Sequence, residues 1–162
     1  MNLKDALRRS PAVCLMVALV LALRGRLRLR HQFVGRAVVM EGGQSFHVFR
    51  HLSRSTSSSG TPAILVVRFR FKKFSQGFNR LLSLVPVPLI GGFPGFRDKV
   101  WMVDEETGDW QGVYEWESAD AVEQYCESFV LAVMTRRAVP ETLSYEANPR
   151  MQLADYLERR IE

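Results

Sequence analysis

The chain has 162 residues, enough for one packed domain with roughly thirty to sixty residues to spare but too few for two ordinary domains. Hydrophobic residues make up 47% and charged residues 24%, which excludes a wholly disordered, collagen-like or multi-span membrane protein. Cys14 and Cys126 lie far apart, so we expect neither a disulfide framework nor a Cys-x-x-Cys pair. A reducing, cytoplasmic compartment fits this cysteine usage best.

The net charge of +5 is distributed unevenly along the chain. Residues 1–61 hold ten Lys or Arg and two acidic residues, whereas residues 62–162 hold twelve and fifteen. The border between them, residues 53–62, consists of Ser, Thr, Gly and Pro at nine of ten positions, which is typical of a flexible linker. We therefore predict a basic N-terminal appendage over residues 1–52, a Ser-rich linker over 53–62 and the main domain over 63–162.

Residues 11–23 form an uncharged apolar run flanked by arginines. As a helix, these residues would reach about 20 Å, which is shorter than the ~30 Å hydrocarbon core of a bilayer. No convincing signal-peptidase site follows the run. Two interpretations stay open: the helix packs on the folded domain, or it lies in a membrane interface, peripheral at the inner face of the membrane.

Four arginines follow the apolar run at every second position: Arg24, Arg26, Arg28 and Arg30. In an extended chain this spacing places the four guanidinium groups in one row. Such a row can contact the phosphates of an anionic membrane surface. Nucleic acid is the less favoured ligand, because no aromatic residues are interleaved with these arginines to stack on bases.

A hairpin is predicted next, because two β-prone segments, residues 37–40 and 46–49, flank Glu41-Gly42-Gly43-Gln44. His47 and His51 stand four residues apart, a spacing that puts both on one face of a helix or a strand. The third histidine is remote and no carboxylate neighbours the pair. We therefore expect ordinary surface histidines and no metal site.

The hydrophobic pattern of the last hundred residues predicts an alternation of strands and helices. The predicted elements are strand 63–71, helix 75–85, strands 99–103 and 111–117, helix 118–137, strand 143–146 and a terminal helix that opens at 148–149. This order is the ferredoxin-like βαββαβ plan, an α+β fold in which both helices cover one face of an antiparallel sheet. The other sheet face should be polar, covered by the N-terminal region or paired with a second copy of the chain.

Two finer expectations concern single side chains of this domain. Arg68 and Arg70 share one side of their strand and are expected to pair across strands with Glu115 and Glu117. Cys126 falls on the apolar side of the helix that begins at Ser118, so we expect a buried, inert thiol.

Several motifs of this domain occur together: Pro94-Gly95-Phe96, Lys99-Val100-Trp101, Glu105-Glu106-Thr107-Gly108, Gly112-Val113-Tyr114 and the stretch from Ser118 to Tyr125. With these motifs, residues 63–147 resemble the YdhR-like monooxygenases of the dimeric α/β-barrel superfamily, relatives of the antibiotic-biosynthesis monooxygenases. The resemblance implies a homodimer whose two sheets pack face to face as a barrel, with a pocket between sheet and helices in each subunit. It also implies a hydrophobic aromatic ligand that is bound or oxidised, often without a bound cofactor.

Chemistry of this kind needs a site that deprotonates and holds a phenol-like substrate, which calls for hydrogen-bonding aromatic residues and a base in an apolar cavity. The candidate substrate-binding residues are Arg68, Phe78, Trp101, Tyr114 and Trp116. Tyr114 and Trp116 share one side of their strand, but the pattern leaves open which side faces the helices.

No bound cofactor is expected, because the sequence contains no nucleotide-binding or metal-hydrolase motif. All three histidines precede residue 52, so a proximal haem ligand is not expected in the main domain either. Two hypotheses therefore stay open: a cofactor-independent monooxygenase for an aromatic small molecule, or a non-catalytic ligand-binding or dimerisation module at a membrane surface.

Overall fold

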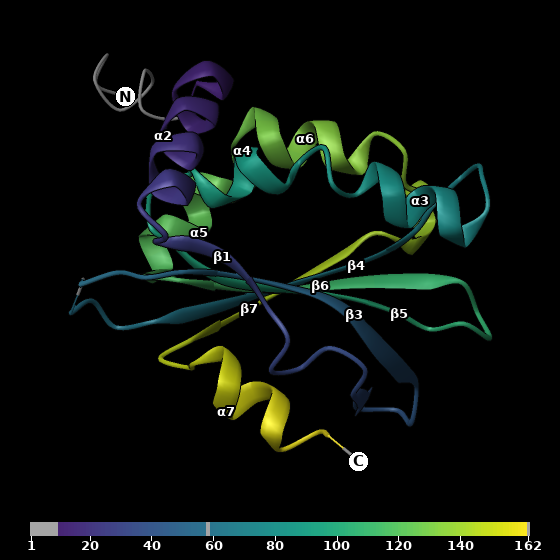
Figure 1. Cartoon of the computed structure of the whole chain (residues 1–162). Coiled ribbons are helices and arrows are strands. Elements are labelled where there is room, and N and C mark those ends of the chain that lie inside the picture. Colours follow the sequence, from purple (N-terminus) through teal and green to yellow (C-terminus); the bar gives the residue numbers. More distant parts are fainter. Residues whose placement is uncertain (1–9, 58, 162) are drawn as a thin grey trace.

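The computed structural model of the chain describes residues 10–57 and 59–161, which form a seven-stranded antiparallel sheet with helices on both of its faces (Figure 1). The strands lie in the order β1-β3-β5-β6-β4-β7, and β2 pairs with β3. One face carries α2 and α3 to α6, and the other face carries α7 (Figure 1).

The C-terminal part of the sheet has the predicted ferredoxin-like plan. Its strands are β4 (Ala63–Arg70), β5 (Phe96–Val103), β6 (Asp109–Trp116) and β7 (Ser144–Pro149), in the spatial order β5-β6-β4-β7. Helices α3 (Gln76–Leu82) and α4 (Val87–Gly91) connect β4 to β5, and α5 (Ala119–Cys126) and α6 (Phe129–Thr135) follow β6. A short 3₁₀ turn, η1 (Pro140–Thr142), precedes β7. The α+β, βαββαβ prediction is confirmed.

The N-terminal region extends the same sheet. The predicted hairpin is present as β2 (Ala37–Val39) and β3 (Ser45–Arg54), with Ala37 opposite His47. Strand β3 also pairs with β5, and β1 (Leu27–Arg30) pairs with the far side of β3. Without β3, the backbone of β5 would form an open sheet edge. The Ser-rich segment therefore joins two strands of one sheet.

Helix α2 (Pro11–Leu23) begins at the predicted residue and is capped by Ser10, whose Oγ accepts from the Val13 N–H. Its Cys14, Ala18 and Leu21 are buried, so one side of the helix packs on the domain. The approach to α4 is very close, because a Cβ atom at Gly92 would lie 1.8 Å from the Cys14 carbonyl oxygen. Within the described ranges, no helix is long and apolar enough to cross a membrane.

The prediction of a single helix over residues 118–137 is wrong, because this segment forms two helices, α5 and α6, with a break between them. At the break, the Ser128 hydroxyl donates to the Tyr125 carbonyl and accepts from the Leu131 N–H. Hydrogen bonds of this kind compete with a continuous helix and start a new one. The break also changes the position of Cys126, which is exposed rather than buried.

The second face of the sheet is covered within the chain. Helix α7 (Leu153–Glu158) buries Leu153, Tyr156 and Leu157 in a core that also contains residues of β2, β3 and the β1–β2 connection. The N-terminal region thus covers part of this face, which was one of the expected alternatives. Helix α7 begins later than predicted, because Asn148 and Pro149 still pair with β4. The homodimer stays a prediction.

Candidate functional site

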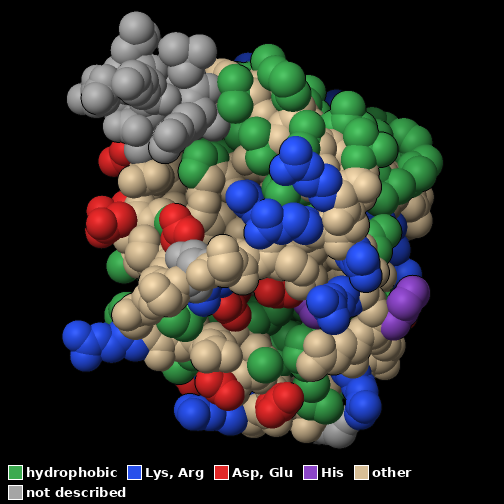
Figure 2. All heavy atoms as spheres, turned by 60° about the vertical axis from the view of Figure 1, so that its left-hand side comes forward, with side chains coloured by type: hydrophobic (Ala, Val, Ile, Leu, Met, Phe, Trp, Pro, Cys, Tyr) green, Lys and Arg blue, Asp and Glu red, His purple; other side chains and the backbone are tan. Residues whose placement is uncertain are grey.

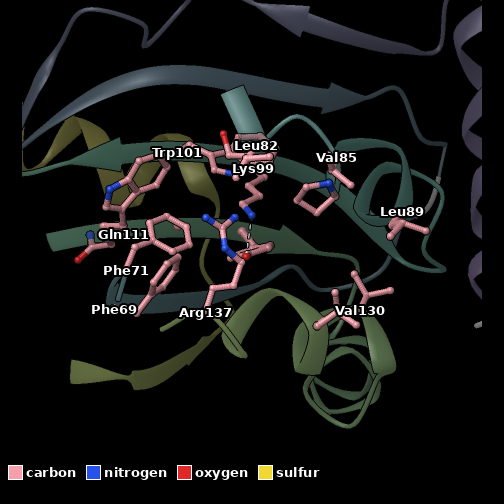
Figure 3. Close-up of a pocket in the computed structure, with 16 residues that line it drawn as sticks. Phe69, Phe71, Leu82, Val85, Leu89, Lys99, Trp101, Gln111, Val130 and Arg137 are labelled. Atoms are coloured by element: carbon pink, nitrogen blue, oxygen red, sulfur yellow. Dashed lines mark hydrogen bonds between the residues drawn. The ribbon is translucent and has the colours of Figure 1, made fainter. Parts of the chain in front are cut away.

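A cavity of about 230 Å³ lies between the sheet and its helical layer (Figure 3). Aromatic side chains of β4, β5 and β6 form its floor, among them Phe69, Trp101 and Trp110. Aliphatic side chains close it from above, including Leu82 of α3 and Val130 of α6. Most of the wall is therefore apolar, and the few polar groups in it determine what the cavity can bind.

Two of the five predicted site residues, Trp101 and Tyr114, line this cavity. Their side of the sheet faces the helices, which answers the question that the alternation left open. Trp116 is buried on the same side beyond the cavity, with its ring centroid 6.3 Å from that of Tyr114. Phe78 lies outside the cavity on α3 and is 44% exposed. Arg68 lies on the opposite face of the sheet.

The expected ion pairs of Arg68 and Arg70 with Glu115 and Glu117 are wrong, because the register of β4 and β6 places other residues opposite them. Arg68 faces Gln111 and donates from Nε to its Oε1 at 2.9 Å. Arg70 faces Asp109 and forms an ion pair with it at 2.8 Å. Both partners lie nearer the start of β6 than predicted.

Lys99 is a buried amine at the cavity wall, and the sequence reasoning missed its role. The side chain is 1% exposed, and Nζ donates to the Tyr114 hydroxyl oxygen at 2.7 Å. Nζ also lies 4.1 Å from the centroid of the Trp101 ring. Burial lowers the pKa of Lys99 well below its ordinary value of 10.5, and the positive charge of Arg50 lowers this pKa further. Burial therefore shifts the balance toward the uncharged amine, which can accept a proton.

Gly112 makes room for this arrangement on the neighbouring strand. A Cβ atom at this position would lie 2.9 Å from the Tyr114 ring and 3.3 Å from Cε of Lys99. Both distances are shorter than an ordinary carbon–carbon contact. Because the residue opposite Trp101 is a glycine, the side chains of Lys99 and Tyr114 can occupy the space above this position of β6.

Two buried tyrosines, Tyr114 and Tyr125, extend the hydrogen-bonded group that begins at Lys99. Burial raises the pKa of Tyr114 and of Tyr125, while a hydrogen bond between their hydroxyls partly opposes the rise for Tyr114. The two ring centroids are 5.4 Å apart. Both phenols therefore stay protonated near neutral pH. The Tyr114 hydroxyl links the Tyr125 hydroxyl to the Lys99 amine in one hydrogen-bonded network.

Arg137 provides a cationic group at the cavity wall. Its guanidinium lies over the Phe71 ring, 5.0 Å from the centroid, and donates to Oδ1 of the buried Asn79 at 2.9 Å. Figure 3 shows Arg137 and Lys99 pointing toward the same space from opposite sides. A guanidinium has five N–H donors, so it can hold Asn79 and an anionic ligand oxygen together.

No protein-family model matches the chain, and no curated protein matches it. Among solved structures, a ferredoxin-fold protein from Listeria monocytogenes related to antibiotic biosynthesis monooxygenases has a TM-score of 0.53. The identity is 8% over 70% of this chain and 69% of that protein. This chain has a ferredoxin-like fold of the same kind.

Two further structures resemble this ferredoxin-like chain less closely. One is from Fusobacterium nucleatum and is provisionally named a monooxygenase; its TM-score is 0.48 and its identity 6%, over 65% of this chain and 49% of that one. The other is an anthrone oxidase-like protein with a TM-score of 0.44 and 16% identity, over 65% of this chain and 53% of that one.

The histidines of this ferredoxin-like chain lie away from the cavity. His51 is 2% exposed and lies 3.0 Å from Asp98, so the expectation of a surface histidine is wrong for this residue. Its strand pairs with β5, which brings the carboxylate close. His47 is exposed. Within residues 10–57 and 59–161, no group of three or more His, Cys, Asp or Glu is placed to hold a metal ion.

The buried Lys99 makes stability depend on pH in a defined direction. Because its pKa is lower in the folded state than in the unfolded chain, the unfolded chain binds the extra proton between the two values. The free energy of unfolding should therefore rise with pH in that window, by at most ~1.4 kcal/mol per pH unit. Urea unfolding of the parent and of Lys99→Met, between about pH 7 and 9.5, measures this dependence. A difference between the two proteins that does not change with pH would contradict it.

Proposed function

We propose that the cavity binds a small aromatic molecule with an acidic hydroxyl group and promotes its oxidation by dioxygen. The observation that carries the proposal is the Lys99 amine, which burial favours in its uncharged form, at the wall of an apolar cavity. Lys99 would remove the hydroxyl proton, and Arg137 would hold the resulting oxyanion. The aromatic floor suits a planar ring system, because stacked and edge-to-face contacts add to the burial of its surface.

The fold is compatible with this chemistry, because the Listeria protein that shares it is related to antibiotic biosynthesis monooxygenases. A shared fold does not establish a reaction, so the proposal depends on the cavity itself. Its groups match the two needs of cofactor-independent oxygen chemistry: a base for the substrate, and a cation near the anion that transfers an electron to dioxygen.

The reaction can be written for an anthrone, a ketone whose enol form is a phenol. Lys99 takes the proton of the enol oxygen, and the enolate carbon reduces dioxygen and forms a carbon–oxygen bond with it. The oxygen–oxygen bond of the resulting peroxide then breaks, and water leaves. In balance, one CH₂ group and one O₂ give one C=O group and one H₂O.

Oxygen uptake with an anthrone or a quinol tests this proposal. For an anthrone, we expect saturable uptake of one dioxygen for each molecule oxidised. Tyr114→Phe, which removes the hydroxyl that contacts Lys99, should lower the rate about tenfold, since one hydrogen bond is lost. Trp101→Phe should weaken substrate binding, because it removes part of the cavity floor. Phe78→Leu is the matched control, because Phe78 lies outside the cavity.

Three outcomes separate the hypotheses. Uptake that falls in Tyr114→Phe and not in Phe78→Leu supports the oxidase. Saturable quenching of tryptophan fluorescence by the aromatic molecule without oxygen uptake contradicts the oxidase and supports a non-catalytic binding module. An absence of binding to any anthrone, quinol or phenol tested would contradict both uses of the cavity.

A further inference from the structure

The outer side of α2 exposes large apolar side chains to solvent. Leu23 is 80% exposed, Met16 62% and Leu19 60%, and Leu15 and Val20 are also exposed. Side chains at these positions lie along one stripe of a helix. The buried side of α2 already packs on α4, so the exposed stripe is not needed for the fold. Such patches commonly mark interaction surfaces.

The same helical layer exposes further apolar side chains beyond α2. Leu81 in α3 is 59% exposed, Val85 before α4 is 68% exposed, and Phe129 in α6 is 62% exposed. Together with the stripe on α2, these residues form what we call the apolar helix face. Figure 2 shows hydrophobic side chains gathered along the top of the molecule, directly above a group of Lys and Arg.

Basic residues gather beside α2 in the apolar helix face, whereas the exposed acidic residues of the helical layer, Asp120, Glu123 and Glu127, belong to α5 and its C-terminal end. Between residues 6 and 97 the sequence contains a single acidic residue, Glu41, and fifteen of the seventeen acidic residues lie in residues 98–162. Helices α2, α3, α4 and α6 contain none. The four arginines that follow α2 are all exposed. The predicted extended row is present in part, because β1 contains Arg28 and Arg30.

We propose that the apolar helix face and the adjoining arginines bind the surface of an anionic lipid membrane. The apolar side chains would enter the region between headgroups and acyl chains, and the arginines would contact lipid phosphates. α2 would lie in the plane of the interface, because its 13 residues are too few to cross a bilayer.

Charge favours lipid over a second copy of the chain as the occupant of this face. A symmetric dimer through the apolar helix face would use the same patch on both copies. Such a dimer would bury the apolar side chains, but helices α2, α3, α4 and α6 of the second copy offer no acidic residue to pair with the arginines. An anionic lipid surface offers apolar and negatively charged groups together.

The position of this face also bears on the cavity, a consequence that rests on the proposed function. Val85 and Val133 line the cavity and are 68% and 38% exposed, so the cavity borders the apolar helix face. A hydrophobic aromatic molecule dissolved in the membrane could then enter the cavity directly from the lipid.

Flotation of the full chain with lipid vesicles tests the membrane proposal without any cavity ligand. We expect binding to vesicles that contain phosphatidylglycerol, little binding to pure phosphatidylcholine, and weaker binding as salt increases. The paired change Arg24→Gln with Arg28→Gln should lower partitioning about 25-fold, since each charge contributes about fivefold. The matched control is Arg36→Gln with Arg159→Gln, which removes the same charge from exposed residues away from this face.

A neutral substitution tests the apolar part of the surface. Leu19→Gln should lower partitioning at least about tenfold, because a leucine side chain is no longer buried in lipid. Val34→Gln is the control, since Val34 is an exposed apolar residue beside the α7 face of the sheet. Equal binding to neutral and anionic vesicles would overturn the proposal, as would equal losses in test and control variants. Self-association in solution that Leu19→Gln abolishes would overturn it in favour of a dimer. None of these results depends on oxygen uptake.

Discussion

Replacing Lys99 by methionine should strongly lower turnover while leaving the fold at least as stable as in the parent. Methionine fills a similar volume, and it removes an amine that burial penalises in its charged form. Near neutral pH, the free energy of unfolding should stay the same or rise by about 1–2 kcal/mol. The rate of oxygen uptake should fall about 10²–10⁴-fold, which is the usual contribution of a positioned general base.

The dependence of the rate on pH separates a catalytic lysine from a merely structural one. In the parent, the rate should fall as pH decreases through the lowered pKa of Lys99, because the protonated amine cannot accept the substrate proton. The residual rate of Lys99→Met should lack this step. A variant that keeps the parent's rate and pH profile would show that Lys99 takes no part in the reaction.

The largest effect on stability is expected for Gly92→Ala. A Cβ atom at this position would lie 1.8 Å from the Cys14 carbonyl oxygen, so α2 and α4 could not keep their present separation. Backbone atoms cannot move aside as a flexible side chain does, and overpacking of a core typically costs about 1–3 kcal/mol. We expect a loss at the upper end of this range, measured by urea unfolding.

Gly77→Ala is the matched control for this substitution. Gly77 lies inside α3, and no atom beyond its neighbours is within 4 Å of the Cβ position. Alanine should therefore stabilise the protein by about 0.5–1 kcal/mol, since glycine is the weaker helix former. A loss of stability in both variants would show that the contact between α2 and α4 is not what makes Gly92 sensitive.

Local patterns along the chain were enough to predict the ferredoxin-like core. The alternation in β4 and the serine caps of α3 and α5 depend on neighbouring residues, and both are present in the structure. Register between distant strands does not follow from such patterns. For this reason Arg70 was assigned to the wrong partner, and the pairing of β3 with β5 was missed.

The candidate site shows the same limit. Trp101 and Tyr114 could be selected because large aromatic residues on a strand suggest a cavity or a core. Lys99 lies on the same strand and the same side as Trp101, two residues away, and this spacing was the available signal. A lysine at a strand position is usually solvated, so this spacing alone does not predict a buried amine. Its burial depends on Gly112 and on the helices above, which single-residue patterns do not reveal.

The connectivity of the sheet has a consequence for synthesis on the ribosome. Strands β3 and β4 follow each other in the chain, yet the β5–β6 hairpin lies between them in the sheet. When the first seventy residues have emerged, β3 and β4 therefore still lack the strands that separate them. The apolar helix α2 also lacks its packing partner α4, which follows later in the chain. Nascent chains of this protein should stay open to chaperones until the hairpin has been translated, and closure of the sheet should be slow compared with helix formation.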